Sequence, residues 1–427
     1  MRILFLTNFY PPFELGGQGQ SCEQVVAGLR ARGHETLVLT SMHGSDNVPA
    51  EADGVRRSLY LEMDMTPWRH SRIFFTERKQ RQRRSRERLA QALAEFQPDL
   101  VFIWGMWNMD RSLAALAEAE RPGRVVYRFA EYWPTLPSQH VFYWRARGRR
   151  WYSRPLKWAL GRVALGLLAL EPEPPALKFE HAISVSAATR DVLRKAGVPL
   201  KDVRVIHTGL DTGRFSARKP DQGETNGSQR LKLLYAGRLS ASKGVETAIK
   251  AVAELVGGRG MREVSLAIAG SGQAEYEKQL RKLVERAGVS EQVTFLGRVP
   301  ASAMPKLLRL FDVLLVPSIW PEPFARSVLE GMLSGLVVVA TPTGGTPEIV
   351  WNGENGLLFA PGDARDLAEA LARLAADPAL RARLAQAGRL TVRVKFTAAK
   401  MIDKIEAYLQ EVAAAAEPAP ARLEAEA

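Results

Sequence analysis

The segment ILFLTNFYPPFELGGQGQSCEQVVAGLRARGHETLVLTS occupies residues 3–41 and holds an apolar run, a glycine-rich loop, an amphipathic run and a second apolar run. The apolar runs predict buried strands, and the helical spacing of apolar residues over 22–31 predicts a helix between them. Ser21 with Gln24 three residues later predicts a capping box, and Gly33 suits the helix C-terminus. Strand, helix and strand in this order predict a βαβ unit and a parallel sheet.

The same alternation continues in two series. The first contains the apolar strands DLVFIW, RVVYRF, HAISVS and VRVIH, and the second, from Leu231, contains LKLLYAG, VSLAIAG, VTFLG, VLLVPS and VVVAT. Between the two series, residues 216–230 are polar and without periodicity, which predicts an interdomain linker. We therefore expect an α/β protein of two doubly wound, Rossmann-like domains that face each other across a ligand-binding cleft.

Composition excludes several classes of protein. With 427 residues, 46% hydrophobic and 25% charged, the chain is neither a low-complexity polymer nor one small domain. The single Cys22 cannot form an intrachain disulfide and leaves no thiol set for zinc, which favours a reducing compartment. The N-terminal apolar run is too short for a signal peptide, and the run 158–170 is too short to cross a bilayer. We expect a cytoplasmic protein.

The net charge of +13 lies in two segments, which we call the first and second basic segments. Residues 69–88 hold nine Lys or Arg against two Glu, and residues 141–157 hold six and no acid, with aromatic residues in both. Three interpretations are open: solvated helix faces, nucleic-acid binding, or contact with an anionic membrane surface. We favour the membrane, because Trp, Tyr and Phe suit the headgroup boundary and no nucleic-acid module accompanies the charge. No nucleic-acid partner is expected.

Two cations follow the first strand of the second series. Arg238 comes directly after LLYAG, and Lys243 lies five residues later at the start of a helix. Fixed cations beside a helix N-terminus suit a diphosphate, whose charge they share with the backbone N–H groups. For this pair alone, ordinary surface cations are an equal alternative.

Two carboxylates follow a later strand. Glu322 stands in a Pro-bounded loop, and Glu330 is eight residues further on. A carboxylate can accept two hydrogen bonds at once and so suits the vicinal hydroxyls of a sugar. The backbone amides of Phe324 and Ala325, near the helix start, could hold another polar group.

Two glycine pairs would let the backbone approach a ligand. Gly344 and Gly345 lie in the loop PTGGTPEIV, and Gly16 and Gly17 lie in the N-terminal loop. A lone glycine pair is usually only a turn, so these four residues gain weight from the neighbouring motifs.

Together these motifs resemble the retaining glycosyltransferases of family 4, which have the two-domain GT-B fold. The resemblance rests on PPFELGG near the N-terminus, AGRLSASKG at 236–244, EPFARSVLE at 322–330, GGTPEIV from 344 and NGENGLLFAPGD ending at 363. It implies a domain over 1–210 that is completed by a helix at about 396–412 packing back on it, and a second domain over 211–395. The composition of 413–427 predicts a disordered tail.

The resemblance also implies a role for each residue. Arg238 and Lys243 would hold the diphosphate of a nucleotide-sugar donor, Glu330 the nucleotide ribose, and Glu322 would face the donor sugar. Phe324 and Ala325 would offer backbone contacts to sugar hydroxyls, and Gly17 would approach the diphosphate from the other domain. Arg298 and Val299 would lie near the base. The implied activity is transfer of a sugar to an acceptor hydroxyl with retention of anomeric configuration.

No metal and no cofactor beyond the sugar nucleotide is expected, because the chain lacks an obvious Asp-x-Asp motif and the two cations can neutralise the leaving group. The chain departs from the family in one loop, after the strand at 124–129, where many members have a His and this chain has Glu131. Glu131 could orient a substrate or be structural, and His207 is expected to be structural.

The acceptor is expected to be a lipid-linked or cell-envelope saccharide, reached from the inner face of the membrane. A nucleotide-sugar-binding protein without transferase activity and a same-fold epimerase or phosphorylase are the alternatives.

Overall fold

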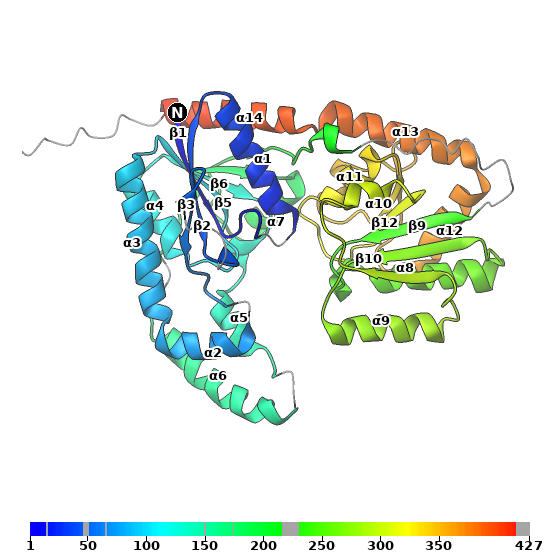
Figure 1. Cartoon of the computed structure of the whole chain (residues 1–427), viewed down its shortest axis with the longest axis horizontal. Helices are drawn as coiled ribbons and strands as arrows, with labels where there is room; N and C mark the ends of the chain where they lie inside the picture. The colour runs from blue at the N-terminus through cyan, green and yellow to red at the C-terminus, as the bar shows by residue number, and fades with distance from the viewer. Residues whose placement is uncertain are drawn as a thin grey trace, which may run out of the picture. The chain divides into compact units, whose positions relative to one another are not determined.

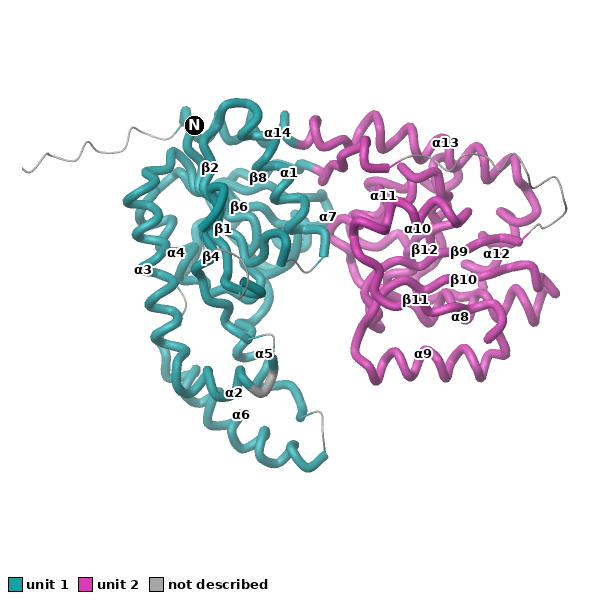
Figure 2. The backbone as a smooth tube through the Cα atoms, viewed as in Figure 1, with its two compact units in different colours: residues 1–206, 402–427 teal, residues 207–401 magenta. Residues whose placement is uncertain are grey.

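The computed structural model describes residues 1–13, 16–45, 51–64, 66–148, 151–173, 175–215 and 230–415. The chain forms two compact units: unit 1 is Met1–Ile206 with Ile402–Ala427, and unit 2 is His207–Met401 (Figure 2). Each unit is built on its own largely parallel sheet with flanking helices (Figure 1). The predicted pair of doubly wound α/β folds is confirmed. The predicted linker lies outside the described residues, except for Arg230.

Unit 1 holds an eight-stranded sheet in the order β3-β4-β2-β1-β5-β6-β7-β8, in which only the β3–β4 pair is antiparallel. Its strands are β1 (Arg2–Thr7), β2 (Glu35–Ser41), β3 (Glu51–Ala52), β4 (Val55–Leu59), β5 (Leu100–Gly105), β6 (Val125–Phe129), β7 (His181–Ser184) and β8 (Asp202–Val205). The central strand β5 is buried along its whole length, as expected of a parallel sheet with both faces covered.

The helices of unit 1 are α1 (Gly17–Ala31), α2 (Pro67–Thr76), α3 (Arg78–Phe96), α4 (Ser112–Glu120), α5 (Gln139–Arg145), α6 (Arg154–Ala169) and α7 (Ala187–Lys195). Figure 1 shows α2, α5 and α6 grouped together away from the strands of the sheet. The predicted capping box was wrong, because α1 begins at Gly17 with Gly16 at the N-cap, so Ser21 lies inside the helix. Gly33 has φ +84° after the helix end, which confirms its expected place.

The C-terminal helix α14 (Ala398–Ala415) packs on unit 1, as the resemblance implied. Arg32 forms ion pairs with Asp403 and Glu406, and Tyr408 donates a hydrogen bond to Asp202 at 2.8 Å. α14 extends to Ala415, so residues 413–415 of the expected disordered tail are helical, and the rest of that tail lies outside the described residues.

Unit 2 holds a six-stranded parallel sheet in the order β11-β10-β9-β12-β13-β14. Its strands are β9 (Leu231–Ala236), β10 (Val264–Ala269), β11 (Val293–Gly297), β12 (Val313–Val316), β13 (Val337–Ala340) and β14 (Leu357–Leu358). Its helices are α8 (Val245–Ala253), α9 (Ala274–Arg286), α10 (Met304–Leu308), α11 (Arg326–Leu333), α12 (Ala364–Ala376) and α13 (Pro378–Lys395).

Both faces of this second sheet are buried. Leu233 and Tyr235 of β9 belong to one hydrophobic cluster, whereas Leu234 between them belongs to another. Since successive side chains of a strand point to opposite faces, helices must cover the sheet on both sides. The loops at the carboxyl ends of the strands are then the part of the unit where polar residues can gather.

Candidate functional site

An ion pair lies at the carboxyl end of the unit 2 sheet. Lys243 follows β9 and Glu322 follows the neighbouring strand β12, and the Lys243 ammonium contacts the Glu322 carboxylate. The same carboxylate oxygen accepts a hydrogen bond from the Ser318 hydroxyl at 2.7 Å. The Glu322 side chain is 10% exposed and that of Lys243 is 26% exposed. The sequence placed both residues in the site but gave no sign that they pair.

The glycine pair after β13 is packed on the backbone of Glu322. The N–H of Gly345 donates a hydrogen bond to the Glu322 carbonyl at 2.7 Å. Gly344 has φ +56°, and a Cβ there would lie 2.1 Å from that carbonyl oxygen. Only glycine fits both the backbone conformation and the space. The structure thus brings Lys243, Glu322, Gly344 and Gly345 together.

The loop before α11 presents unpaired backbone donors. Ala325 is the N-cap residue of α11, and the N–H groups of Phe324 and Ala325 reach no acceptor among the residues described in the structure. The Phe324 ring stacks on His207 with centroids 5.3 Å apart. His207 is in turn held by Glu348 at 2.8 Å, so it supports the loop as a structural residue.

Glu330, the second of the two carboxylates that follow β12, is held by an ion pair within α11. Arg326 donates to Glu330 at 2.9 Å, one helical turn apart, and both side chains are less than 20% exposed. The Arg326 guanidinium therefore orients the Glu330 carboxylate.

Arg238 and Arg298 are exposed cations at the same edge of the sheet. Arg238 follows β9, where its carbonyl accepts a hydrogen bond from Tyr235 at 2.7 Å, and its guanidinium forms no ion pair with any residue of the described ranges. Arg298 follows β11, which is two strands away from β9, while Val299 packs against a hydrophobic cluster. Two exposed guanidinium groups are available to anions.

Unit 1 carries the remaining predicted residues at the carboxyl ends of β1 and β6. Gly16, with φ +91°, caps the N-terminus of α1, which begins at Gly17. Glu131 accepts a hydrogen bond from the Trp107 N–H at 3.3 Å and another from the side chain of Gln18, the residue after Gly17. The structure therefore brings Gly16, Gly17 and Glu131 to one edge of this sheet. Burial raises the pKa of Glu131 to about 7.

A second carboxyl group nearby escaped the sequence reasoning. Glu62 accepts a hydrogen bond from the Gln139 N–H at 2.8 Å, and its own N–H donates to the carbonyl of Asn108 at 2.9 Å. Burial raises the pKa of Glu62 to about 7. No motif marks this glutamate, because only the fold brings the loop after β4 to the loop after β5.

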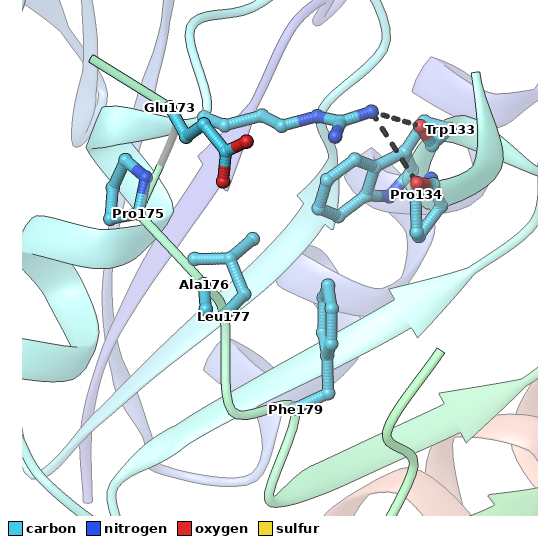
Figure 3. Close-up of a pocket in the computed structure, with 8 residues that line it drawn as sticks. Trp133, Pro134, Glu173, Pro175, Ala176, Leu177 and Phe179 are labelled. Atoms are coloured by element: carbon cyan, nitrogen blue, oxygen red, sulfur yellow. Dashed lines mark hydrogen bonds between the residues drawn. The ribbon is translucent and has the colours of Figure 1, made fainter. Parts of the chain in front are cut away.

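A pocket of about 330 Å³ opens in unit 1 (Figure 3). Arg111 donates to the carbonyls of Trp133 and Pro134 at its rim, at 3.0 and 3.4 Å. Leu177, Phe179 and Glu173 also line it. None of the site residues predicted from the sequence lines this pocket. Residues 173–179, which contribute to its lining, carry no sequence motif that could have indicated a pocket.

Comparison with known proteins places the chain in a family. The model of the glycosyl transferases group 1 matches residues 218–391, and the model of glycosyltransferase family 4 matches residues 15–214. The glycogen synthase of Mycobacterium tuberculosis is 28% identical over 414 residues, covering 91% of this chain and 89% of that protein.

Two solved structures share the fold. The sucrose-phosphate synthase of Thermosynechococcus elongatus has a TM-score of 0.73 at 20% identity, covering 97% of this chain and all of that one. HepE of Anabaena, solved with UDP-glucose, has a TM-score of 0.67 at 21% identity, covering 96% of this chain and all of that one.

The chain belongs to the group 1 glycosyltransferases of family 4, and the expected enzyme class, a retaining glycosyltransferase, is confirmed. This membership favours the transferase over the alternatives of a binding protein and of a same-fold epimerase or phosphorylase.

Proposed function

We propose that the chain transfers a sugar from a nucleoside-diphosphate-sugar donor to an acceptor hydroxyl with retention of configuration, and that the edge of the unit 2 sheet binds the donor. The observation that carries the proposal is the cluster of Lys243, Glu322, Gly344 and Gly345 beside the exposed Arg238. The UDP-glucose bound by HepE, a protein of the same fold, supports a sugar nucleotide as the donor.

The chemistry of the donor half follows from charge. As the anomeric bond breaks, negative charge develops on the leaving diphosphate, and Arg238 with Lys243 would stabilise it by preorganised electrostatics. Glu322 holds the Lys243 ammonium at this position through their ion pair. Glu322, next to this lysine, would then face the donor sugar, and the free amides of Phe324 and Ala325 would bind sugar hydroxyls.

The rest of the donor would lie along the same edge. Glu330, oriented by Arg326, would accept hydrogen bonds from the two ribose hydroxyls. Arg298 and Val299 would border the base, the former by its charge and the latter by its apolar surface. Gly344 and Gly345 would allow the backbone to approach the donor.

We assign the acceptor half of the reaction to unit 1. Glu131, with its pKa of about 7, can accept or donate a proton near neutrality and so suits contact with a hydroxyl nucleophile. The N-terminus of α1 at Gly16 and Gly17 would contribute backbone N–H groups to an anionic substrate.

We further propose that the acceptor is a lipid-linked or cell-envelope saccharide, used on the cytoplasmic face of a membrane. The two basic segments with their aromatic residues support this, because they suit acidic headgroups. Among the described residues, no helix is long and apolar enough to cross a bilayer.

The first test is a thermal-shift titration with UDP, GDP, ADP, CDP and TDP on the wild type, Arg238→Ala/Lys243→Ala, and Lys250→Ala as a control. Lys250 is exposed on α8. One nucleotide should stabilise the wild type and the control by mass action but not the double variant. Equal stabilisation of all three proteins would refute the assignment of the two cations. Transfer of a labelled sugar from the matching donor then tests the activity itself.

A further inference from the structure

Part of the first basic segment is paired with carboxylates inside unit 1. Arg78 is buried, lies over the Phe74 ring, and forms two hydrogen bonds with Glu171 at 2.6 and 2.8 Å. Arg81 pairs with Glu77 at 2.7 Å, one turn earlier in the chain. The contacts of Arg78 tie α3 to α2 and to the end of α6, whereas the Arg81 pair is local to the start of α3. The charge of this segment therefore serves the fold as well as the surface.

Helix α6, in contrast, is apolar on both sides. One side packs against α2 and α5, where Phe74, Trp144 and Ala164 form a small cluster with Leu160, Leu165 and Leu168. At Gly161 the helix lies so close to α5 that a Cβ would be 3.0 Å from the Trp144 carbonyl. This packing fixes the orientation of α6 on unit 1.

The other side of α6 exposes large apolar side chains to solvent. Leu156 and Trp158 are each 65% exposed, Val163 57%, Leu167 44% and Leu170 85%. Leu156, Val163, Leu167 and Leu170 recur at helical spacing and so share one face. A helix that is apolar all round is normally buried in protein or lipid. The exposed face of α6 is therefore suited to burial against a partner.

The charges and rings around this face indicate which partner. The only charged residues of α6 are Arg154, Lys157 and Arg162, and the helix has no acid. Trp151 and Tyr152, just before it, are 80% and 57% exposed. Cations flanking an apolar stripe, with Trp and Tyr at its edge, match the anionic headgroups and acyl boundary of a bilayer.

The length of the helix decides between lying on a membrane and crossing it. α6 has 16 residues, about 24 Å at 1.5 Å per residue, which is shorter than the roughly 30 Å hydrocarbon core. We propose that α6 lies in the plane of an anionic bilayer, with the face of Leu156, Val163, Leu167 and Leu170 inserted, and anchors unit 1 there. This inference deepens the proposed membrane contact, on which it rests, by adding one inserted helix to the cations of the second basic segment.

The test is flotation of the full chain with vesicles of phosphatidylcholine alone or mixed in equal parts with phosphatidylglycerol. Leu156→Gln/Val163→Gln/Leu167→Gln removes the apolar face without changing charge. The control is Leu310→Gln/Leu390→Gln/Val394→Gln, whose side chains in unit 2 are 62%, 61% and 48% exposed and so match the three on α6.

We expect the wild type and the control to float with the mixed vesicles, and the α6 variant to bind at least about tenfold more weakly, because it loses three apolar side chains. A fluorophore on Leu170→Cys should shift to the blue on these vesicles, whereas one on Leu390→Cys should not. The labelling is selective because Cys22 is fully buried.

Three results would overturn the inference: equal flotation of wild type and the α6 variant, no flotation of the wild type, or no fluorescence shift at position 170. A dimer of the wild type that becomes a monomer in the α6 variant, without lipid binding, would instead assign the face to a second copy of the chain. Nucleotide-induced stabilisation of both triple variants keeps this test separate from the donor site. If no nucleotide stabilises the wild type or either triple variant, the proposed function is contradicted, whereas the flotation and fluorescence results decide the anchor.

Discussion

Replacement of Lys243 by Met would test the ion pair at the edge of the unit 2 sheet. The substitution keeps an unbranched side chain of similar length and removes the charge that faces Glu322. The Glu322 carboxylate would retain the Ser318 hydroxyl, at 2.7 Å, but lose its cation. We therefore expect a loss of stability as well as a loss of donor binding.

The size of the stability loss follows from burial. Breaking a buried ion pair costs about 3–5 kcal/mol, and an exposed pair contributes about 0–1 kcal/mol. This pair is intermediate, with side chains 10% and 26% exposed, so its loss should cost about 1–3 kcal/mol. For a unit of this size, each kcal/mol lowers Tm by about 2–4 °C, so Tm should fall by about 2–12 °C.

The assay is thermal unfolding at pH 7.5 with and without the stabilising nucleotide, with Lys250→Met on α8 as the matched control. Lys250 is exposed, and the control should match the wild type in Tm and in the nucleotide response. The Lys243→Met variant should have a lower Tm and a smaller nucleotide-induced shift. If the two variants behave alike in both measurements, the pair neither stabilises the unit nor binds the donor.

Three further predictions concern single sites. Gly344→Ala should destabilise unit 2 by at least about 2 kcal/mol more than Gly353→Ala in thermal unfolding. Both glycines have positive φ, but only at Gly344 would a Cβ meet a backbone atom, the Glu322 carbonyl oxygen. Equal losses of stability in the two variants would exclude this steric reason. Burial lowers the pKa of His140 to about 3, so below pH 6.5 the unfolded chain takes up a proton that the folded chain does not, and stability falls as the pH falls. Between pH 6 and pH 4, the free energy of unfolding in urea should therefore fall by about 1 kcal/mol per pH unit less in His140→Phe than in the wild type. If the free energy of unfolding falls equally with pH in both proteins, this prediction is contradicted. Burial raises the pKa of Glu131 to about 7, so the pH dependence of kcat/KM should show an inflection near pH 7, and Glu131→Gln should remove this inflection. If the inflection persists in the variant, it belongs to another group.

Much of the fold could be predicted from the sequence, because each buried strand of a parallel sheet is a short apolar run that local periodicity reveals. The capping box at Ser21 failed for a physical reason. α1 starts at Gly17, where the Gly16 backbone turns, and Ser21 is carried inside the helix. The motif was present, but side-chain chemistry alone did not fix which turn of the helix is the first.

The sequence by itself determined the class of the protein: two doubly wound domains, the family 4 motifs, and the loops in which Arg238, Lys243, Glu322 and Glu330 lie. These are local patterns, and they survive without knowledge of any distant contact. Only the tertiary structure decided that Lys243 pairs with Glu322, 79 residues later in the chain, and that α6 exposes an apolar face. Such pairings depend on which strands become neighbours and which helix faces are covered, and those choices are made by packing of segments far apart in the sequence.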